Sequence, residues 1–427
     1  MVLVALALRL VVVAADSGYE PANDAFEYDY YARSIAAGDG YPESGYLLYG
    51  GPTAIRGPGY PYLLGGVYAL SGDSRLAGQL AGAALGALTV LLLYLIVARI
   101  WGRRTGLAAA ALAAAFPPLV LLSRDLVSET LFLPLVLAAA LCVLEFRRSG
   151  GTLRWAAAAG ALCGLAALTR NAGIALVLPI ALGVWTARPA LRPRSLSAPA
   201  IAVACALLTV APWLVRDAAE FGQFVPLTTS SGIATAGTYN SASYDDEDSH
   251  GAWRDPQTVR GFTHLFVTPG IDEAEVDTDL RKAARDFAWR HPAYVAETTA
   301  WNLLRLFEIA EGSVVDDEGR AVSDRGIGSA VSTSERIGIG LAVALAAIGL
   351  WAILRSRRAS RYGGGPPDIP SGPMFLWLIP ILMILSAAPI AGLPRYRLPA
   401  DPFLLLLTAV GLLWLWDRLR HREAAAL

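Results

Sequence analysis

The chain has 427 residues, of which 55% are hydrophobic and only 17% charged, and its formal net charge is −1. A soluble domain carries about 25% charged residues, and here the apolar residues come in blocks near the ~20 residues that cross a bilayer. The composition therefore excludes a soluble globular protein and predicts an all-α polytopic membrane protein. Its three cysteines, Cys142, Cys163 and Cys205, lie in apolar blocks without CxxC spacing, so we expect neither disulfide nor metal site from them.

Ten apolar blocks predict about ten transmembrane helices. The first block is short and carries Arg9 in its middle, but we expect an uncleaved helix rather than a signal peptide, because the segment that follows needs a tether. Residues 58–72 are too short and interrupted to span, and we interpret them as interfacial or re-entrant. The ten blocks are 1–15, 76–99, 106–122, 127–145, 155–169, 172–187, 198–215, 336–354, 373–392 and 402–417.

Arginine placement predicts the sidedness of these helices. The alternate connections 99–104, 147–154, 188–194 and 355–361, together with the tail after 417, each hold three or four arginines. Because basic residues concentrate on the cytoplasmic side, these connections are expected inside. The segments 16–75 and 217–334 then lie outside.

The second external segment, 217–334, is a long loop between the seventh and eighth predicted helices. It holds 20 acidic and 9 basic residues, and its stretch 281–308 has apolar residues at helical spacing, which predicts an amphipathic surface helix. We therefore divide the chain into an N-terminal transmembrane catalytic module (1–216, including the first external loop 16–75), the acidic loop, and C-terminal transmembrane helices (335–427).

Several charged residues sit at the external ends of the predicted spans. Arginine presents a planar fork that binds phosphate oxygens in bidentate fashion, and a carboxylate can accept a proton or hold a divalent cation. Together at a membrane surface they suit a lipid phosphate whose group is passed to a hydroxyl arriving from outside. The residues are Asp24, Glu27, Asp29, Arg56, Arg124, Asp125, Glu129, Arg170, Arg395 and Arg397.

Five stretches in this order resemble the landmarks of the C-type integral-membrane glycosyltransferases, and most of all the branch of protein O-mannosyltransferases and lipid A aminoarabinose transferases. The resemblance covers roughly residues 1–220 and 285–420. One departure is the turn after Arg56, which reads Arg-Gly-Pro instead of the more usual basic-Pro-Pro. The stretches are "NDAFEYDYYARSIAAGDGY", "GPTAIRGPGYPYLL", "SRDLVSETLF", "GLAALTRNAGIAL" and "PRYRLPADPFLLLL".

The resemblance implies that Asp24 is the catalytic carboxylate delivered to the membrane edge by the first helix. Tyr28 would share its helical face, and Glu27 and Asp29 are secondary candidates. The plain alternative is that Asp24 caps a helix, with Glu27 as its capping-box partner.

Glu129 matches the second catalytic carboxylate of such enzymes, which assists through a metal or orients the acceptor; its alternative is a helix-start glutamate stabilised by the helix dipole. Asp125 is a secondary candidate that could instead pair with Arg124.

The resemblance further assigns four arginines to the donor phosphate: Arg56, Arg170, Arg395 and Arg397. Their alternative role is to reach lipid headgroups. No cofactor is certain, although a divalent cation, Mg or Mn, could bind at Asp24 and Glu129.

The expected activity is transfer of a sugar from a polyprenyl-phosphate donor to an acceptor hydroxyl, with inversion and Asp24 as base. The enzyme would be a multi-pass protein of the plasma membrane with an extracytoplasmic site. Its partners would be the lipid-linked donor, a lipid, glycan or protein acceptor, and membrane lipids, but no nucleic acid. The alternatives are a transporter or flippase of lipid-linked sugars, a lipid-linked oligosaccharide ligase, and a non-catalytic scaffold whose acidic loop binds a partner.

Overall fold

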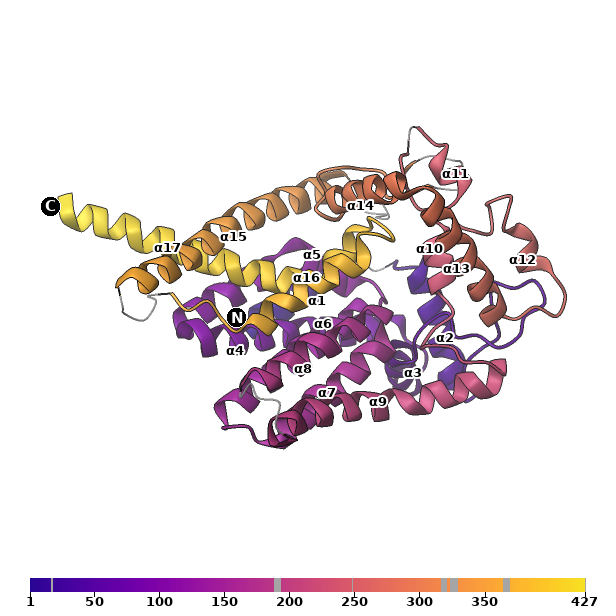
Figure 1. Ribbon diagram of the computed structural model, residues 1–427, viewed down its shortest axis with the longest axis horizontal. Coiled ribbons are helices and arrows are strands. Elements are labelled where there is room, and N and C mark those ends of the chain that lie inside the picture. The colour runs from indigo at the N-terminus through magenta and orange to yellow at the C-terminus, as the bar shows by residue number, and fades with distance from the viewer. Residues whose placement is uncertain are drawn as a thin grey trace.

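All ten apolar blocks overlap helices in the computed structural model, which describes residues 1–16, 18–187, 193–247, 249–315, 321–322, 329–363 and 369–426 (Figure 1). Five helices in this part of the chain are long and apolar enough to cross a membrane, and four shorter apolar helices accompany them. The count of ten spans therefore stays a prediction. The apolar helices are α1 (Val2–Ala15), α4 (Arg75–Ala115), α6 (Glu129–Arg148), α7 (Leu153–Thr169), α8 (Val177–Trp185), α9 (Pro193–Phe221), α15 (Ser329–Gly363), α16 (Met374–Ala387) and α17 (Asp401–Ala426).

The helix α4 contains two of the predicted spans, which meet at Gly102. This glycine has φ 85° and ψ 166°, a non-helical conformation that favours glycine. Beyond it the chain folds back, because Gly106 lies against the side chain of Ala98. The second half ends at Ala115 and the short α5 (Pro117–Leu121) follows, so the block 106–122 is less regular than we predicted.

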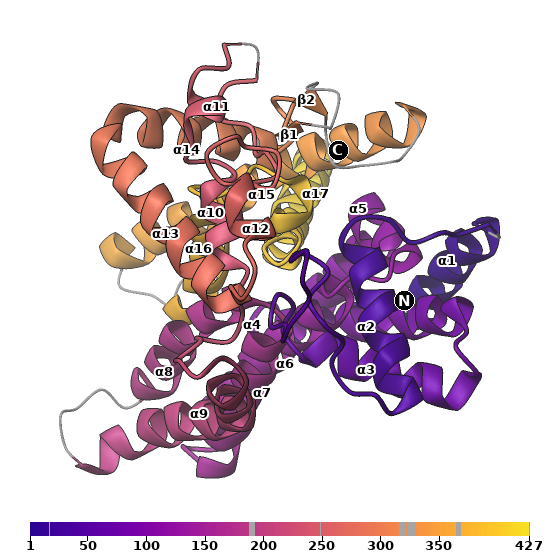
Figure 2. The same ribbon diagram turned by 90° about the vertical axis from the view of Figure 1, so that its right-hand side faces the viewer.

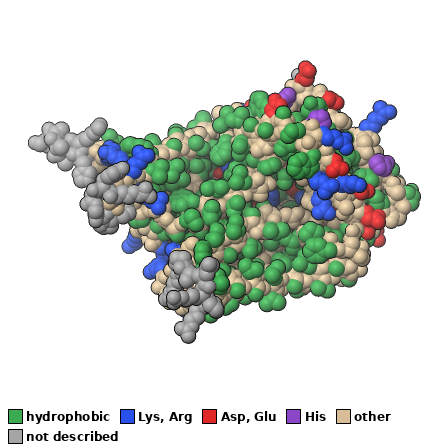
Figure 3. All heavy atoms as spheres, viewed as in Figure 1, with side chains coloured by type: hydrophobic (Ala, Val, Ile, Leu, Met, Phe, Trp, Pro, Cys, Tyr) green, Lys and Arg blue, Asp and Glu red, His purple; other side chains and the backbone are tan. Residues whose placement is uncertain are grey.

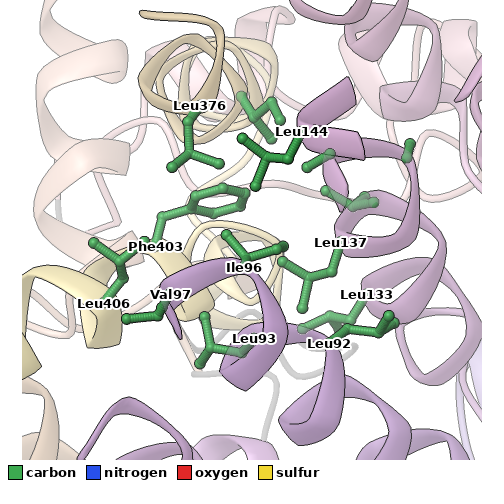
Figure 4. Packing of buried hydrophobic residues seen from close by; sticks show 14 of the residues in the cluster. Leu92, Leu93, Ile96, Val97, Leu133, Leu137, Leu144, Leu376, Phe403 and Leu406 are labelled. Carbon is green, nitrogen blue, oxygen red and sulfur yellow. The ribbon is translucent and has the colours of Figure 1, made fainter. Parts of the chain in front are cut away.

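The core is formed where α4, α6, α16 and α17 meet (Figure 4). Leucine, valine and phenylalanine side chains interdigitate there. Apolar burial does not drive helices together inside lipid, so close packing must hold them. Glycine provides it between α15 and α17: a methyl group on Gly349 or Gly411 would overlap the backbone of the facing helix.

The remaining elements gather at one end of the molecule, at the right of Figure 1 and facing the viewer in Figure 2. One of them corrects our expectations: the stretch 281–308 is two helices, because Pro292 starts a new one after His291. The segment 58–72 contains one short helix, and its interfacial or re-entrant position stays a prediction. The elements are α2 (Asp24–Ala37), α3 (Gly59–Ser71), α10 (Ser231–Ala236), α11 (Ser241–Tyr244), α12 (Thr263–Val267), α13 (Glu273–Arg290), α14 (Pro292–Leu306), and the antiparallel strands β1 (Val314–Val315) and β2 (Ala321–Val322).

Charge is distributed unequally along the long axis. On the face shown in Figure 3, the end near the C-terminus displays basic side chains, whereas the opposite end mixes acidic, basic and histidine side chains. The middle is covered by apolar side chains, as a lipid-facing surface requires. In the arginine-rich connection 188–194, residues 188–192 lie outside the described part of the chain.

Candidate active site

The site begins at α2, which follows the first apolar helix. Asn23 is the N-cap residue of α2, in the left-handed region with φ 51°, so Asp24 is not the cap. Asp24 instead forms ion pairs with two arginines. One oxygen lies 2.5 Å from Nη2 of Arg56 and the other lies 2.6 Å from Nη2 of Arg395. The capping-box alternative for Asp24 and Glu27 is thereby wrong.

Arg56 comes from the loop before α3 and joins two acids of α2. Its Nε lies 2.7 Å from Glu27, while its Nη2 binds Asp24. The guanidinium also lies over the ring of Tyr28, 5.5 Å from its centroid. The second Glu27 oxygen accepts a hydrogen bond of 2.7 Å from the hydroxyl of Tyr46. Glu27 therefore orients Arg56 and is itself held in place.

A second ion pair is formed by Glu129, the first residue of α6, and Arg170, which directly follows α7. Their side chains meet at 2.6 Å, and Glu129 is fully buried. Nη1 of Arg170 also donates to the hydroxyl of Ser128, at 3.0 Å. Arg170 and Arg395 lie over the ring of Tyr396, at 5.3 and 5.5 Å. The ring of Tyr396 thus contacts two arginines that come from distant connections.

The arginines determine the ionisation of Asp24. Burial alone would raise the pKa of this carboxyl, but the charges of Arg395, Arg56 and Arg170 outweigh burial and hold the pKa below its usual value. Asp24 is therefore an anion throughout the physiological pH range.

Three adjoining cavities surround these charges. The α16 cavity, of about 350 Å³, is lined by Asp24, Arg56 and Arg170 and by apolar residues of α16 such as Met383 and Ala387. Each of these cavities lies within the size range of ligand pockets.

The other two cavities are both lined by Arg395. The loop cavity, of about 370 Å³, shares Asp24 and Arg56 with the α16 cavity and is also lined by Tyr46 and Trp253 from the external loops. The third cavity, of about 380 Å³, is lined by residues including Tyr19, Arg124, Asp125, Glu129 and Arg395.

The structure does not bring every candidate to this cluster. Asp29 is buried on another face of α2, where it binds Tyr68, Arg33 and Arg75. Arg397 is fully buried and pairs with Asp401 and Glu308, so its guanidinium lies away from the three cavities.

Arg124 and Asp125 line the third cavity. Arg124 lies 3.3 Å from Asp16 and 3.9 Å from Asp125, so the expected pair exists, but Asp16 is the closer partner.

Both carboxylates proposed for a divalent cation are paired with arginines. Asp24 is shared by two arginines and Glu129 is held by a third. Among the described residues, no three acidic, histidine or cysteine side chains converge as metal ligands do. A divalent cation at Asp24 and Glu129 therefore stays a prediction.

Several site residues were absent from our sequence candidates. Tyr396 lies between Arg395 and Arg397 in a motif that we had noted, so its neighbours were a usable signal. Asn171 likewise follows Arg170 in a stretch quoted above, whereas Tyr46 carried no such signal, because it is uncharged and no candidate residue adjoins it.

Part of the sequence and the overall fold are similar to those of known glycosyltransferases. Residues 55–215 match the family model of dolichyl-phosphate-mannose-protein mannosyltransferases. One solved structure with a similar fold is that of the archaeal oligosaccharyltransferase AglB from Archaeoglobus fulgidus, in complex with an inhibitory peptide and a dolichol-phosphate. It is 16% identical, with a TM-score of 0.55, over 99% of this chain and 50% of that one.

Two further structures are similar. The apo form of the Archaeoglobus fulgidus enzyme is 16% identical, with a TM-score of 0.55, over 100% of this chain and 51% of that one. ArnT from Cupriavidus metallidurans, bound to undecaprenyl phosphate, is 16% identical with a TM-score of 0.42, over 96% and 76% of the two chains. No curated protein sequence matches the chain.

The family match over residues 55–215 and the shared fold support the resemblance to the C-type integral-membrane glycosyltransferases. The similarity to the mannosyltransferases lies in the first half of the chain, and the chain spans about half the length of the archaeal oligosaccharyltransferases whose fold it shares.

Proposed function

We propose that the protein transfers a sugar from a polyprenyl-phosphate donor to an acceptor hydroxyl at the extracytoplasmic face of the membrane. The observation that carries the proposal is the position of Asp24, a carboxylate held between Arg56 and Arg395 at the boundary of two cavities. One cavity is walled by a membrane helix and the other by external loops.

The two cavities suit two different substrates. Met383 and Ala387 of α16 give the α16 cavity an apolar wall, along which a lipid tail can enter from the bilayer. The loop cavity is lined by Tyr46 and Trp253 of the external segments, so an acceptor can enter it from water. The AglB structure supports this use of the fold, because that protein was solved with a dolichol-phosphate and a peptide together.

The reaction follows from this arrangement. The acceptor oxygen attacks the anomeric carbon of the sugar, and its proton passes to a carboxylate oxygen of Asp24. The bond from the anomeric carbon to the phosphate oxygen breaks, and the phosphate leaves with the electron pair. Attack opposite to the leaving group inverts the anomeric configuration.

The arginines have two successive partners in this mechanism. Before the donor binds, Arg56 and Arg395 neutralise Asp24 and keep its pKa low, which makes it a poor proton acceptor. A donor phosphate attracts the same guanidinium groups. As they turn to the phosphate, the pKa of Asp24 rises and the carboxylate becomes a stronger base when the substrate is in place. The arginines then stabilise the charge of the leaving phosphate.

Glu129 has a positioning role in this mechanism. Buried beneath Arg170, it holds that guanidinium at the edge of the α16 cavity, where a phosphate can reach it. We derive no step through a metal ion, since the arginines occupy both carboxylates that could bind it.

The rival functions find less support. Transporters place substrate groups near the bilayer midplane between repeated halves, whereas these charges gather at helix ends beside the loop-rich end of the molecule. An oligosaccharide ligase would use the same cavities with a larger donor. It differs from our proposal in the group that is transferred, and not in the roles of Asp24 and the arginines.

The test uses a strain that lacks the gene, complemented with variants of the full chain. We expect lipid mass spectrometry to show an accumulated polyprenyl-phosphate sugar, cleared by the wild type but not by Asp24→Asn. Asp39→Asn is the matched control, because Asp39 is exposed in the same external segment and should clear the lipid normally. Normal clearance by a stably inserted Asp24→Asn protein would rule out the catalytic role.

A further inference from the structure

A small polar cluster lines the α16 cavity apart from the charged residues. The side-chain amide of Asn171 donates to the hydroxyl of Thr228 at 2.5 Å and to that of Ser230 at 3.4 Å. The two hydroxyls lie 2.8 Å from each other. Asn171 directly follows Arg170, whereas Thr228 and Ser230 come from the second external segment, so two distant parts of the chain build this wall.

One atom of the Asn171 amide is left without a partner. Its Oδ1 is buried and accepts no hydrogen bond from any described residue. Turning the amide by half a rotation does not remove the deficit, because the nitrogen would then be the unpaired atom. An unpaired buried amide atom is costly, because it has lost water without gaining a partner. The group is therefore suited to a ligand that can donate or accept a hydrogen bond.

The backbone before this wall is strained. Leu227 has φ 78°, a conformation that is rare for a bulky residue. In the residues that follow, Thr228 turns to Asn171, while Thr229 turns away and binds Glu273 at 2.7 Å. Such strain persists where the surrounding structure fixes it, often at ligand sites.

The charges of the cavity restrict what this wall can face. Of the described residues that line it, only Asp24, Arg56 and Arg170 are charged. The proposed function assigns all three to the base and the phosphate. The wall of Asn171, Thr228 and Ser230 is uncharged and offers both donors and acceptors.

We propose that Asn171, Thr228 and Ser230 bind the hydroxyl groups of the donor's sugar and select an uncharged sugar. This inference rests on the proposed function and extends it to the substrate class. A sugar hydroxyl both donates and accepts, so it satisfies the Asn171 amide in either orientation. An amino sugar would bring a cation to a wall with no carboxylate of its own. A uronic acid would compete with the phosphate for the arginines.

The test measures transfer by the purified full chain in nanodiscs with three donors: polyprenyl-phosphate mannose, polyprenyl-phosphate glucose and polyprenyl-phosphate 4-amino-arabinose. We expect turnover of a neutral donor and a much lower kcat/KM for the amino sugar. Asn171→Ala should lower kcat/KM for the neutral donor about tenfold, the effect of losing roughly one hydrogen bond. Its affinity for sugar-free polyprenyl phosphate should not change.

Two further variants keep the outcome clear. Ser230→Ala leaves the Asn171–Thr228 contact intact and should also lower kcat/KM for the neutral donor. This variant tests the inference even if Asn171→Ala does not fold. Thr235→Val is the matched control, because the Thr235 hydroxyl already donates within α10 to the carbonyl of Ser231. Wild-type preference for the amino sugar, or unchanged kcat/KM in both variants, would overturn this inference. Absence of transfer from all donors by the wild type would overturn the proposed function as well.

Discussion

Asp24 and Asp29 lie five residues apart on α2 and have different partners. Five residues turn a helix by about 140° beyond a full revolution, so Asp24 faces the cavities while Asp29 faces α3 and α4. Asp29 accepts hydrogen bonds from Tyr68 at 2.5 Å and from Arg33 and Arg75 at 3.1 Å. Its side chain is 5% exposed, so its contribution is to stability.

We predict that Asp29→Ala destabilises the protein without removing the chemistry. The buried Tyr68 hydroxyl loses its acceptor, which costs about 1–3 kcal/mol, whereas Arg33 and Arg75 are partly exposed and can be hydrated. Thermal unfolding in detergent should show a lowered Tm, while turnover per folded molecule is retained. Unchanged Tm with lost turnover would instead place Asp29 in the reaction.

The lowered pKa of Asp24 leads to a prediction for pH dependence. In the free enzyme, kcat/KM should show no acidic limb from Asp24 above about pH 4, the ordinary value of an aspartate, because the arginines hold its pKa lower still. In the donor complex the arginines turn to phosphate and the pKa rises. The acidic limb of kcat should therefore lie at higher pH than that of kcat/KM.

Arg395→Gln tests whether this arginine lowers the pKa of Asp24. Arg395 is the strongest of the charges that lower the pKa of Asp24, so its loss should shift the acidic limb of kcat/KM to higher pH. The ion pair also contributes stability above the unfolded pKa, and this contribution is lost as pH falls through the lower folded pKa. Identical pH profiles for the two proteins would contradict the proposed coupling.

Part of the site could be predicted from the sequence. Sidedness alone brings Asp24, Arg56 and Arg395 to one surface, since alternate helix ends share it. It could not distinguish Arg395 from Arg397, which are two residues apart in a short 3-10 helix, Pro394–Arg397. One enters the site and the other is buried against Asp401, and only the packing around that helix determines which.

At the scale of elements, the start of α3 packs directly on the end of α7. A methyl group on Gly57 would overlap the carbonyl oxygen of Leu168, and one on Gly59 would lie 2.5 Å from Thr169. This close approach explains why the turn reads Arg-Gly-Pro: a side chain after Arg56 would separate the two elements. It also sets Arg56 near Arg170, which follows Thr169.

We predict that Gly57→Ala lowers donor use through Arg56. The backbone of α7 cannot yield, so the turn must move and displace the guanidinium, and a shift of 1 Å at an active site can cost about 100-fold in rate. The expected result is a higher KM for the donor and a lower kcat/KM. Gly66→Ala, within α3 itself, is the control, because no atom lies within 4 Å of its added methyl group. Equal effects in both variants would show general destabilisation of α3 instead.

The helices themselves were easier to predict than their breaks. Long apolar blocks form helices in lipid because every backbone group must be satisfied internally, and this fixed most of the fold. The return at Gly102 and the break at Pro292 depend on single residues. The small helices that close the cavities, such as α10, have no periodic pattern long enough to detect.

At the scale of the whole molecule, α6 links the site to the arginine-rich end. It begins at Glu129 and ends at Arg148, about 30 Å away at 1.5 Å per residue. The excess of arginine at that end predicts that it is cytoplasmic, and the site then faces outward. This orientation decides whether the acceptor arrives from outside the cell.

We predict that cysteines placed at the two ends react from opposite sides of the membrane. After Cys142, Cys163 and Cys205 are replaced, Lys282→Cys on α13 should react with an impermeant maleimide in intact cells. Arg148→Cys should react only after permeabilisation, because its end of the molecule is predicted to be cytoplasmic. Both Lys282 and Arg148 are exposed, so neither reaction is limited by burial. The reverse pattern would place Asp24 in the cytoplasm and contradict transfer to an external acceptor; reaction of both in intact cells would contradict the assignment of opposite sides.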